Sequence, residues 1–272
     1  MPPKTTFLPA LFLAHGAPSL VLQPGPVATI LARTAADLPR PRAIVVVSAH
    51  WETPHPRVGS AAELVTLHDF YGFPQELYGV SYPARSDHAV AHEVHDLLRA
   101  NGLDAALDNS RGLDHGAWTP LSLIYPQADV PIVPLSLQTE RGPAHHFALG
   151  RALAPLLADG VLLVASGNIT HNLADYRRTA AGDGQTPAYV GEFADWIWQR
   201  ISAGDDQALL DYRRQAPHAL RAHPSEEHLL PLHVARGAAG DDCRPVRLYS
   251  GVDSLVLAMD SYAFWPAAAR HT

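Results

Sequence analysis

Short, continuously apolar segments recur along the chain, and they constrain its fold more than any other sequence feature. Each is only four to eight residues long, and several are rich in β-branched side chains: Leu11–Ala14, Ala43–Val47, Val130–Leu137, Val161–Ala165 and Leu255–Met259. Runs of this length that are bounded by Pro or Gly are typical of strands buried on both faces of a parallel sheet.

The segments between these runs have helical patterns: Val27–Leu38, His88–Ala100, Ala144–Ala158, Tyr189–Ile201 and Glu226–Ala238. Regular alternation of strands and helices predicts an α/β fold, with a central, mostly parallel sheet and helices on both faces. No internal repeat or Gly/Ser linker divides the chain, and the polar segment Ala180–Pro187 is interpreted as a surface loop. We therefore expect residues 1–272 to form a single domain.

Charge and cysteine content exclude several classes of protein. A net charge of −7 and a pI near 6.1, without any Lys/Arg cluster, argue against a nucleic-acid partner. No apolar run approaches the roughly 18 residues of a membrane span, and we interpret Phe7–Ala14 as a buried strand rather than a signal peptide. The one cysteine, Cys243, excludes an internal disulfide framework and a thiolate-built metal site, and fits a cytoplasmic location.

Histidine has an unusual abundance and distribution. The chain contains 16 histidines, and three of them, His15, His50 and His171, stand in the loops that follow apolar runs. In open α/β sheets, ligands bind beyond the carboxyl ends of the strands. Histidines that are far apart in the sequence but stand at several strand ends are therefore expected to meet, as the ligands of a metal ion must.

Each of the first two histidines also has a purely structural interpretation. His15 precedes the small residues Gly16, Ala17 and Pro18 and can cap a turn, while His50 can bond a backbone carbonyl group. Their occurrence together favours metal ligation, with small neighbours that allow a close approach. The residue after His50 is Trp51, which we expect to form an apolar wall beside the ligand.

A third ligand is expected near the start of the last predicted helix. Ser225 is a plausible N-cap, and the acidic residues that follow it complement the helix dipole. His228 then stands at the third helical position, about 100° around the helix from Glu227, so only one of the two is expected to face the metal. We favour His228, with Glu227 as the runner-up; the alternative is that these polar residues only cap the helix.

The residues alone leave the roles of two further histidines open. His115 lies in the glycine-bracketed segment Gly112–Trp118, and His171 lies between Asn168 and Asn172. Each can be a fourth ligand, an acid/base group or a loop hydrogen-bonder. His68 belongs to the aromatic segment Leu67–Pro74, which we expect to line a pocket for a planar substrate.

Most of the remaining histidines are interpreted as structural or solvated. The pattern of His88, His92 and His95 predicts the polar face of an amphipathic helix. The others stand near a helix start or in polar surroundings: His145, His146, His55, His218, His223 and His271.

Six blocks of sequence together resemble the LigB-type class III extradiol dioxygenases, and in particular the DOPA dioxygenase-like branch with the plant betalain enzyme and its bacterial relatives. The blocks follow the order of that family and span nearly the whole chain: His15–Pro18, Ser48–Trp51, His68–Phe70, Asp114–Trp118, Ser166–Leu173 and Glu227–Leu232. The resemblance implies one catalytic domain that uses O₂ to cleave a small catechol, DOPA-like or related, to a ring-opened semialdehyde.

The resemblance also implies roles for individual residues. His15, His50 and His228 would hold the metal, His171 would be the acid/base residue and close enough to be a fourth ligand, and His115 would assist at the substrate oxygens. Other class III enzymes have glutamate in the place of His228. Fe(II) is expected for activity, while Zn(II) can occupy the same ligands but cannot activate O₂ by electron transfer.

Two alternative functions use the same residues. A zinc hydrolase would use a metal-bound hydroxide with His171 as the base, and would work without oxygen. A Memo-like binding protein would have the metal site without any turnover.

Four arginines are candidates to pair with a substrate carboxylate: Arg85, Arg111, Arg177 and Arg178. The sequence does not specify which catechol is bound or the oligomeric state.

Overall fold

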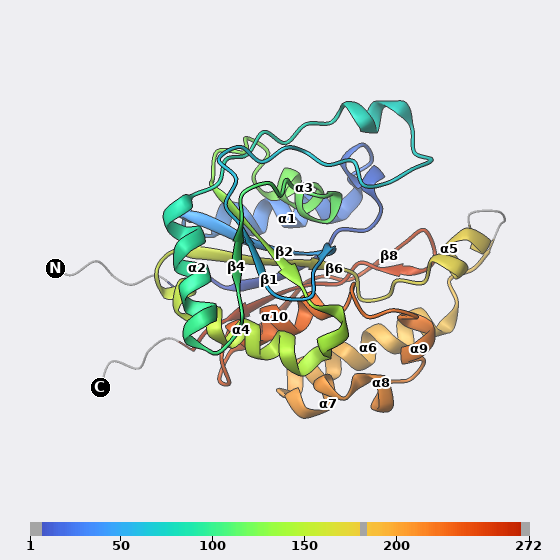
Figure 1. The fold of residues 1–272 in the computed structure, drawn as a ribbon. Helices are drawn as coiled ribbons and strands as arrows, with labels where there is room; N and C mark the ends of the chain where they lie inside the picture. Colours follow the sequence, from blue (N-terminus) through green and yellow to red (C-terminus); the bar gives the residue numbers. More distant parts are fainter. Residues whose placement is uncertain (1–6, 180–183, 268–272) are drawn as a thin grey trace.

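The computed structural model describes residues 7–179 and 184–267, and it has a single large sheet at its centre. The sheet has eight strands in the order β4-β3-β5-β2-β6-β1-β10-β7 (Figure 1). These strands are β1 (Ala10–Ala14), β2 (Ala43–Glu52), β3 (Arg57–Gly59), β4 (Ala106–Asp108), β5 (Ile132–Leu137), β6 (Val161–Gly167), β7 (Arg244–Tyr249) and β10 (Ser261–Trp265). Strands β8 (Val252–Asp253) and β9 (Leu257–Ala258) form a separate antiparallel pair.

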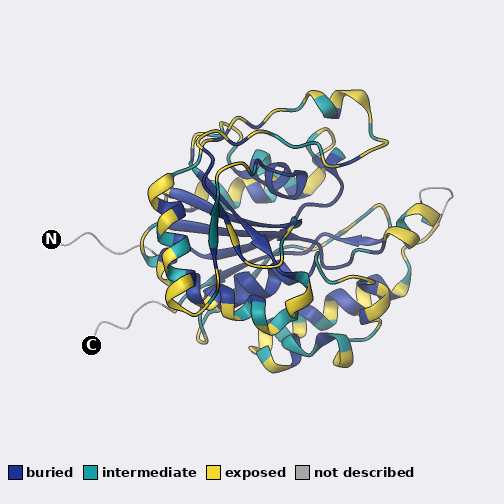
Figure 2. Ribbon diagram, in the orientation of Figure 1, coloured by how far each residue is buried: buried dark blue, intermediate teal, exposed yellow. Residues whose placement is uncertain are grey.

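The four central strands are parallel, as predicted. β2 pairs with β5 and β6, and β6 pairs with β1, all in parallel register. β10 and β7 then extend the sheet in antiparallel register beyond β1. The central strands are buried along their whole apolar length (Figure 2), which explains their continuous hydrophobic sequence.

Helices cover both faces of the sheet, again as predicted. α1 (Gly25–Asp37) and α3 (His115–Ile124) pack on one face, while α2 (His88–Ala100), α4 (Gly142–Ala158), α6 (Ala188–Ala203) and α10 (Leu230–Ala238) pack on the other. The shorter helices are α5 (Leu173–Thr179), α7 (Asp206–Leu210), α8 (Tyr212–Gln215) and α9 (Ala219–Ala222), with 3₁₀ turns η1 (Pro18–Val21), η2 (Gln75–Gly79) and η3 (Thr139–Arg141).

Two predictions about the C-terminal region are wrong in detail. The predicted strand Leu255–Met259 contributes only the two-residue strand β9, while β7 and β10 complete the main sheet. Strand β7 is only partly buried and its sequence is mixed, so a search for continuously apolar runs does not find it. The predicted helix Glu226–Ala238 begins four residues later, at Leu230.

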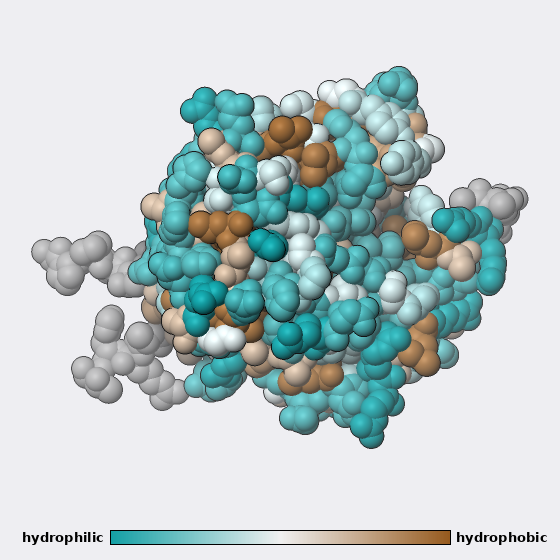
Figure 3. Space-filling model, viewed as in Figure 1, coloured by the Kyte–Doolittle hydropathy of each residue, from teal (hydrophilic) through white to brown (hydrophobic). Residues whose placement is uncertain are grey.

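The surface carries little continuous apolar area on the face seen in Figure 3, where hydrophobic residues form small, separate patches among hydrophilic ones. Among the described residues, no helix is both long enough and apolar enough to cross a bilayer. The polar segment Ala180–Pro187 lies partly outside the described residues, which omit 180–183.

Candidate metal centre and active site

Three imidazole rings from distant parts of the chain meet beyond the carboxyl ends of the central strands. His15 follows β1, His50 lies near the end of β2, and His228 lies in the turn before α10. Nε2 of His50 is 3.3 Å from Nε2 of His15 and 3.2 Å from Nε2 of His228. The fold thus brings together the three residues that the sequence predicts as metal ligands.

Hydrogen bonds on the outer side of two of these rings determine which nitrogen faces the common point. Ser166 donates its hydroxyl proton to the carbonyl oxygen of Gly116, so the Ser166 oxygen accepts from Nδ1–H of His15 at 2.9 Å. The carboxylate of Glu227 can only accept, and it lies 2.9 Å from Nδ1 of His228. Both rings therefore direct an unprotonated Nε2 inward.

Inward lone pairs of this kind fit a metal ion. Nε2 of His15 and Nε2 of His228 both turn a lone pair toward Nε2 of His50, at 3.3 and 3.2 Å, and a neutral His50 ring can donate at most one proton to them. A cation between the three rings would satisfy every lone pair. A zinc–imidazole bond is roughly 2.0–2.1 Å long, so two ligand nitrogens of one ion lie roughly 3 Å apart. Three neutral imidazoles suit Zn, Fe, Cu or Ni rather than Mg or Ca. The separations and the donor set both match such an ion.

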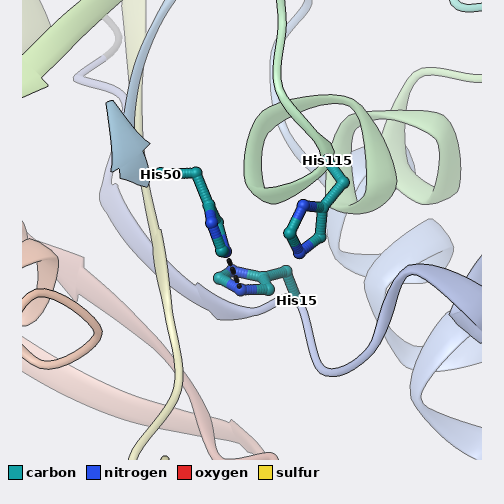
Figure 4. A group of neighbouring side chains, drawn as sticks. All are labelled: His15, His50 and His115. Atoms are coloured by element: carbon teal, nitrogen blue, oxygen red, sulfur yellow. Dashed lines mark hydrogen bonds between the residues drawn. The ribbon is translucent and has the colours of Figure 1, made fainter. Parts of the chain in front are cut away.

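His115, at the start of α3, faces the same space. Its Nδ1–H and its backbone N–H donate to Oδ1 of Asp69, at 3.0 and 2.9 Å. Its ring centroid lies 3.9 Å from that of His50 and 5.5 Å from that of His15 (Figure 4). Nitrogens of these three rings lie within 4.8 Å of one another, so His115 is a geometric alternative to His228 as a ligand.

His171 lies on the other side of His228 and stacks against it. With Glu227 and His228 it forms a second group whose possible ligand atoms lie within 4.8 Å of one another. Nδ1 of His171 is 3.9 Å from Oε1 of Glu227. All five predicted site histidines, His15, His50, His115, His171 and His228, line one pocket.

The pocket has a volume of about 430 Å³, within the range of sites that bind small molecules. Its other walls are mainly small or apolar residues, with two acidic ones: Gly16, Ala17, Pro18, Ala49, Glu52, Phe70, Phe73, Leu173, Tyr176, Glu227 and Leu257. Phe70 and Phe73 confirm that the aromatic segment after His68 contributes to the pocket. Within the described chain, no lysine or arginine lines it.

Burial makes the site histidines poor proton acceptors. It lowers the pKa of His15 and of His228 well below the usual value, and the neighbouring histidines add to the effect. Burial and His115 lower the pKa of His50 to about 4, although Asp114 and Asp69 act in the opposite direction. The pKa of His171 falls from its usual value near 6.5 to about 3, mainly through burial. These rings are thus uncharged at neutral pH.

A buried polar network connects β2 to the start of α3 and positions His50. Asp114 caps α3 by accepting from the backbone N–H of Ala117, and it also accepts the Ser48 hydroxyl proton at 2.5 Å. Ser48 in turn accepts from the backbone N–H of His50 at 3.2 Å. Arg111 donates to Asp114 at 2.6 Å and to the carbonyl oxygen of His50 at 3.3 Å.

Four local predictions need correction. Trp51 does not line the pocket, although His50 and Glu52 do, because successive residues of a strand face opposite sides; its indole lies under the Arg111 guanidinium at 5.2 Å. The segment around His115 is the first turn of α3 rather than a loop. Ser225 caps no helix and instead donates to Glu227. Since Glu227 and His228 precede the helix, both line the pocket, whereas the helical interpretation allowed only one.

The histidines interpreted as structural or solvated behave as expected with one exception. His88 and His92 are exposed on α2, His95 is half-buried beside Asp96, and His145 and His146 lie near the start of α4. His55 and His218 are largely exposed, near Asp104 and Glu192 respectively, while His271 lies outside the described residues. His223 is the exception: it is buried near the rings of Phe193 and Tyr212 and donates to the carbonyl oxygen of Ile169.

Two residues that contact the site, Asp69 and Ser166, were not predicted from the sequence to have a role there. Both stand inside the blocks that carry the family resemblance, and both are polar residues within otherwise apolar or aromatic segments. That contrast was the available signal, but only the tertiary structure shows which histidine each of them contacts.

The fold and the converging histidines are those of a ring-opening dioxygenase. Residues 11–257 match the family described as the catalytic LigB subunit of aromatic ring-opening dioxygenase. The chain belongs to this family, which confirms the resemblance found in its sequence motifs, and it is an extradiol dioxygenase, a metal-dependent oxidoreductase.

Individual relatives agree with this assignment. The chain is 38% identical over 265 residues to a 4,5-DOPA dioxygenase extradiol of Beta vulgaris, with 96% of each chain covered. It is 39% identical over 243 residues to a protein of that name in Escherichia coli K12, with 86% of each covered. An uncharacterised Escherichia coli K12 protein of known crystal structure has a TM-score of 0.76 and 32% identity, covering 94% of this chain and 99% of its own.

Proposed function

We propose that this protein cleaves a DOPA-like catechol with O₂ at the carbon–carbon bond next to the diol. Both oxygen atoms of O₂ enter the product, one ring carbon becoming a carboxylate and its neighbour an aldehyde. The observation that carries the proposal is the convergence of the Nε2 atoms of His15, His50 and His228 at the floor of a pocket with aromatic walls.

We assign His15, His50 and His228 as the metal ligands. The two Nε2 separations of 3.2 and 3.3 Å support this set over one with His115. A bound Fe(II) ion would supply the redox chemistry of O₂ and acidify the catechol; Zn(II) would suit the same ligands without that redox chemistry. Protein isolated with zinc should therefore be inactive until the metal is exchanged.

His171 is assigned as the base that takes a catechol proton and later returns it. Burial lowers the pKa of its ring to about 3 in the empty pocket, so the ring is uncharged there. The negative charge of a bound catecholate would raise that pKa and allow the ring to take up the proton. Its stacked position beside His228 supports a base rather than a fourth ligand. His115 points a second imidazole into the pocket, where it would hydrogen-bond a substrate oxygen.

The pocket walls support a flat, substituted aromatic substrate. Phe70 and Phe73 would pack against the ring, and Leu173 and Leu257 would surround its substituent. None of the four arginines considered as carboxylate partners lines the pocket; Arg111 is engaged by Asp114, and Arg178 by Asp175. A substrate carboxylate would therefore have to lie outside the described walls.

We also propose that residues 1–272 form one catalytic domain that acts on a small diol in the cytoplasm. The family match over residues 11–257 and the single eight-stranded sheet support this proposal. Family membership also favours the dioxygenase over the zinc-hydrolase and Memo-like alternatives.

The test is anaerobic reconstitution with Fe(II), followed by O₂ and a panel of L-DOPA, dopamine, 4-methylcatechol and protocatechuate. We expect O₂ uptake with one or more of them, and a yellow product whose mass equals that of the substrate plus two oxygen atoms. Without O₂ uptake for any catechol, the proposed reaction is wrong; ester hydrolysis by Zn-loaded protein would then favour the hydrolase.

A further inference from the structure

Four of the five pocket histidines form two pairs, His50 with His115 and His171 with His228. Each pair has its own carboxylate, which lies within 4 Å of both members. Oδ1 of Asp69 accepts from His115 at 3.0 Å, while its Oδ2 lies 3.6 Å from Nδ1 of His50. Oε1 of Glu227 accepts from His228 at 2.9 Å and lies 3.9 Å from Nδ1 of His171. Each carboxylate thus joins one proposed metal ligand to one proposed substrate-facing histidine.

We propose that Asp69 and Glu227 are positioning residues that set the tautomers of His115 and His228 respectively, an inference that rests on the proposed function. A carboxylate accepts hydrogen bonds and donates none, so it selects the Nδ1–H form of a ring beside it. The lone pair on Nε2 of that ring then points into the pocket. The oxygen of Glu227 that bonds His228 lies on the outer side of that ring, which favours a positioning role for Glu227 over ligation.

The surroundings hold both carboxylates in place. Asp69 also accepts from the backbone N–H of His115, which ties it to the first turn of α3. Its neighbour Phe70 packs edge-on against the His115 ring, with centroids 5.7 Å apart. Glu227 accepts a further hydrogen bond from the Ser225 hydroxyl at 3.0 Å. Each carboxylate thus has one anchor besides the histidine rings: a backbone N–H for Asp69 and the Ser225 hydroxyl for Glu227.

The distances predict that the two carboxylates contribute differently to metal binding and to catalysis. Glu227 bonds a proposed ligand directly and its base partner at longer range, so its loss should weaken metal binding first. Asp69 bonds the substrate-facing His115 directly and His50 only at 3.6 Å, so its loss should affect catalysis more than metal binding. Removing the partner of a metal-bound histidine typically costs 10–100-fold in metal affinity or activity.

The experiment compares Glu227→Ala and Asp69→Ala with Glu227→Gln and Asp69→Asn, which keep an acceptor oxygen. Glu226→Ala is the matched control, since Glu226 is adjacent but accepts from Tyr212 and does not line the pocket. The dissociation constant of Zn(II) is measured by chelator competition, and kcat and KM by O₂ uptake of Fe(II)-loaded protein. Long-range ¹⁵N–¹H spectra of metal-free protein report the histidine tautomers without any turnover, since an ion bound at Nε2 would itself hold the ring proton on Nδ1.

We expect Glu227→Ala to weaken Zn(II) binding about 10–100-fold, and Asp69→Ala to lower kcat by a similar factor with a much smaller change in Zn(II) affinity. The Gln and Asn variants should recover part of each loss, and Glu226→Ala should match the wild type. The inference is overturned if Nδ1–H of His115 and His228 persists in the Ala variants, or if affinity and kcat stay at wild-type values. If wild-type protein turns over no catechol, the proposed function fails, while affinities and spectra still decide the positioning roles.

Discussion

The ring of His171 lies nearly parallel to that of His228, with centroids 3.4 Å apart and 12° between the planes. An imidazole lone pair lies in the plane of its ring. A metal ion in the plane of His228 would therefore lie about one stacking distance outside the plane of His171, and His171 could not ligate it in this arrangement. The geometry leaves His171 free to move a proton.

Replacement of His171 should therefore separate metal binding from catalysis. We expect His171→Ala to keep its metal content near that of the wild type while turnover falls by roughly 10²–10⁴-fold, the usual contribution of general acid–base catalysis. His171→Gln keeps a hydrogen-bonding side chain but cannot carry a proton, so it should be nearly as inactive. Loss of metal from both variants in elemental analysis would instead identify a fourth ligand, and His115 would become the candidate base.

Alanine substitution should distinguish the ligands from the other site histidines. His15→Ala, His50→Ala and His228→Ala should each lose most of the bound metal, because two imidazoles hold an ion much less tightly than three. His115→Ala is the comparison variant and should keep its metal, since we assign its ring to the substrate. Full occupancy in any two of the three ligand variants would contradict the assignment, and loss of metal from His115→Ala would place His115 in the ligand set.

Gly167 should be intolerant of a side chain, because β6 and His228 approach each other closely there. A Cβ atom at Gly167 would overlap the carbonyl oxygen of His228, a backbone atom that no side-chain rotation can move. We expect Gly167→Ala to lose metal and to lower the melting temperature by roughly 5–10 °C. Gly191→Ala is the control: this helical glycine has open space around it, so alanine there should stabilise the protein slightly. Equal melting temperatures and metal contents for the two variants would refute the prediction.

Charge in the pocket should govern the choice among catechols. Glu52 and Glu227 line it, and the described lining contains no lysine or arginine. We expect dopamine and L-DOPA, which carry an ammonium group, to have kcat/KM values at least about tenfold above that of protocatechuate, whose carboxylate is bonded to the ring; tenfold corresponds to about 1.4 kcal/mol. Steady-state O₂ uptake checks this order, and a preference for protocatechuate would show that a cationic partner has been missed.

Buried histidines away from the metal centre should make metal-free protein sensitive to acid. Burial lowers the pKa of His146 to about 4, and that of His233 to about 3. Their folded pKa values lie below the unfolded value of about 6.5, so the unfolded state binds more protons between these limits. Stability is thus complete above pH 6.5 and is lost as the pH falls toward 4, by about 1.4 kcal/mol per pH unit for each such histidine.

Urea unfolding of metal-free protein between pH 4 and 8 measures this dependence. His146→Gln should reduce the slope between pH 4 and 6.5, because glutamine does not titrate. His92→Gln, at an exposed position of α2, is the control and should leave the slope unchanged. An unfolding free energy that stays constant from pH 8 to 4.5 would contradict the shifted pKa values.

The sequence by itself determined the parallel centre of the sheet and the histidines that converge beyond the ends of its strands. Strands buried on both faces must be continuously apolar, so β1, β2, β5 and β6 are visible in the sequence. Histidines that follow several such strands are expected to meet at one edge of the sheet. The edge strand β7 has one solvated face and a mixed sequence, so the same criterion could not identify it.

Only the tertiary structure decided which partner each site histidine contacts. His15, His50, His115, His171 and His228 are alike as residue types, and what distinguishes them is the partner at the far side of each ring. Ser166, Asp69 and Glu227 are those partners, and two of them are more than forty residues away from a histidine that they contact. Hydrogen bonds between distant segments form only when the chain has packed, so residue order cannot specify which nitrogen of each ring faces the metal.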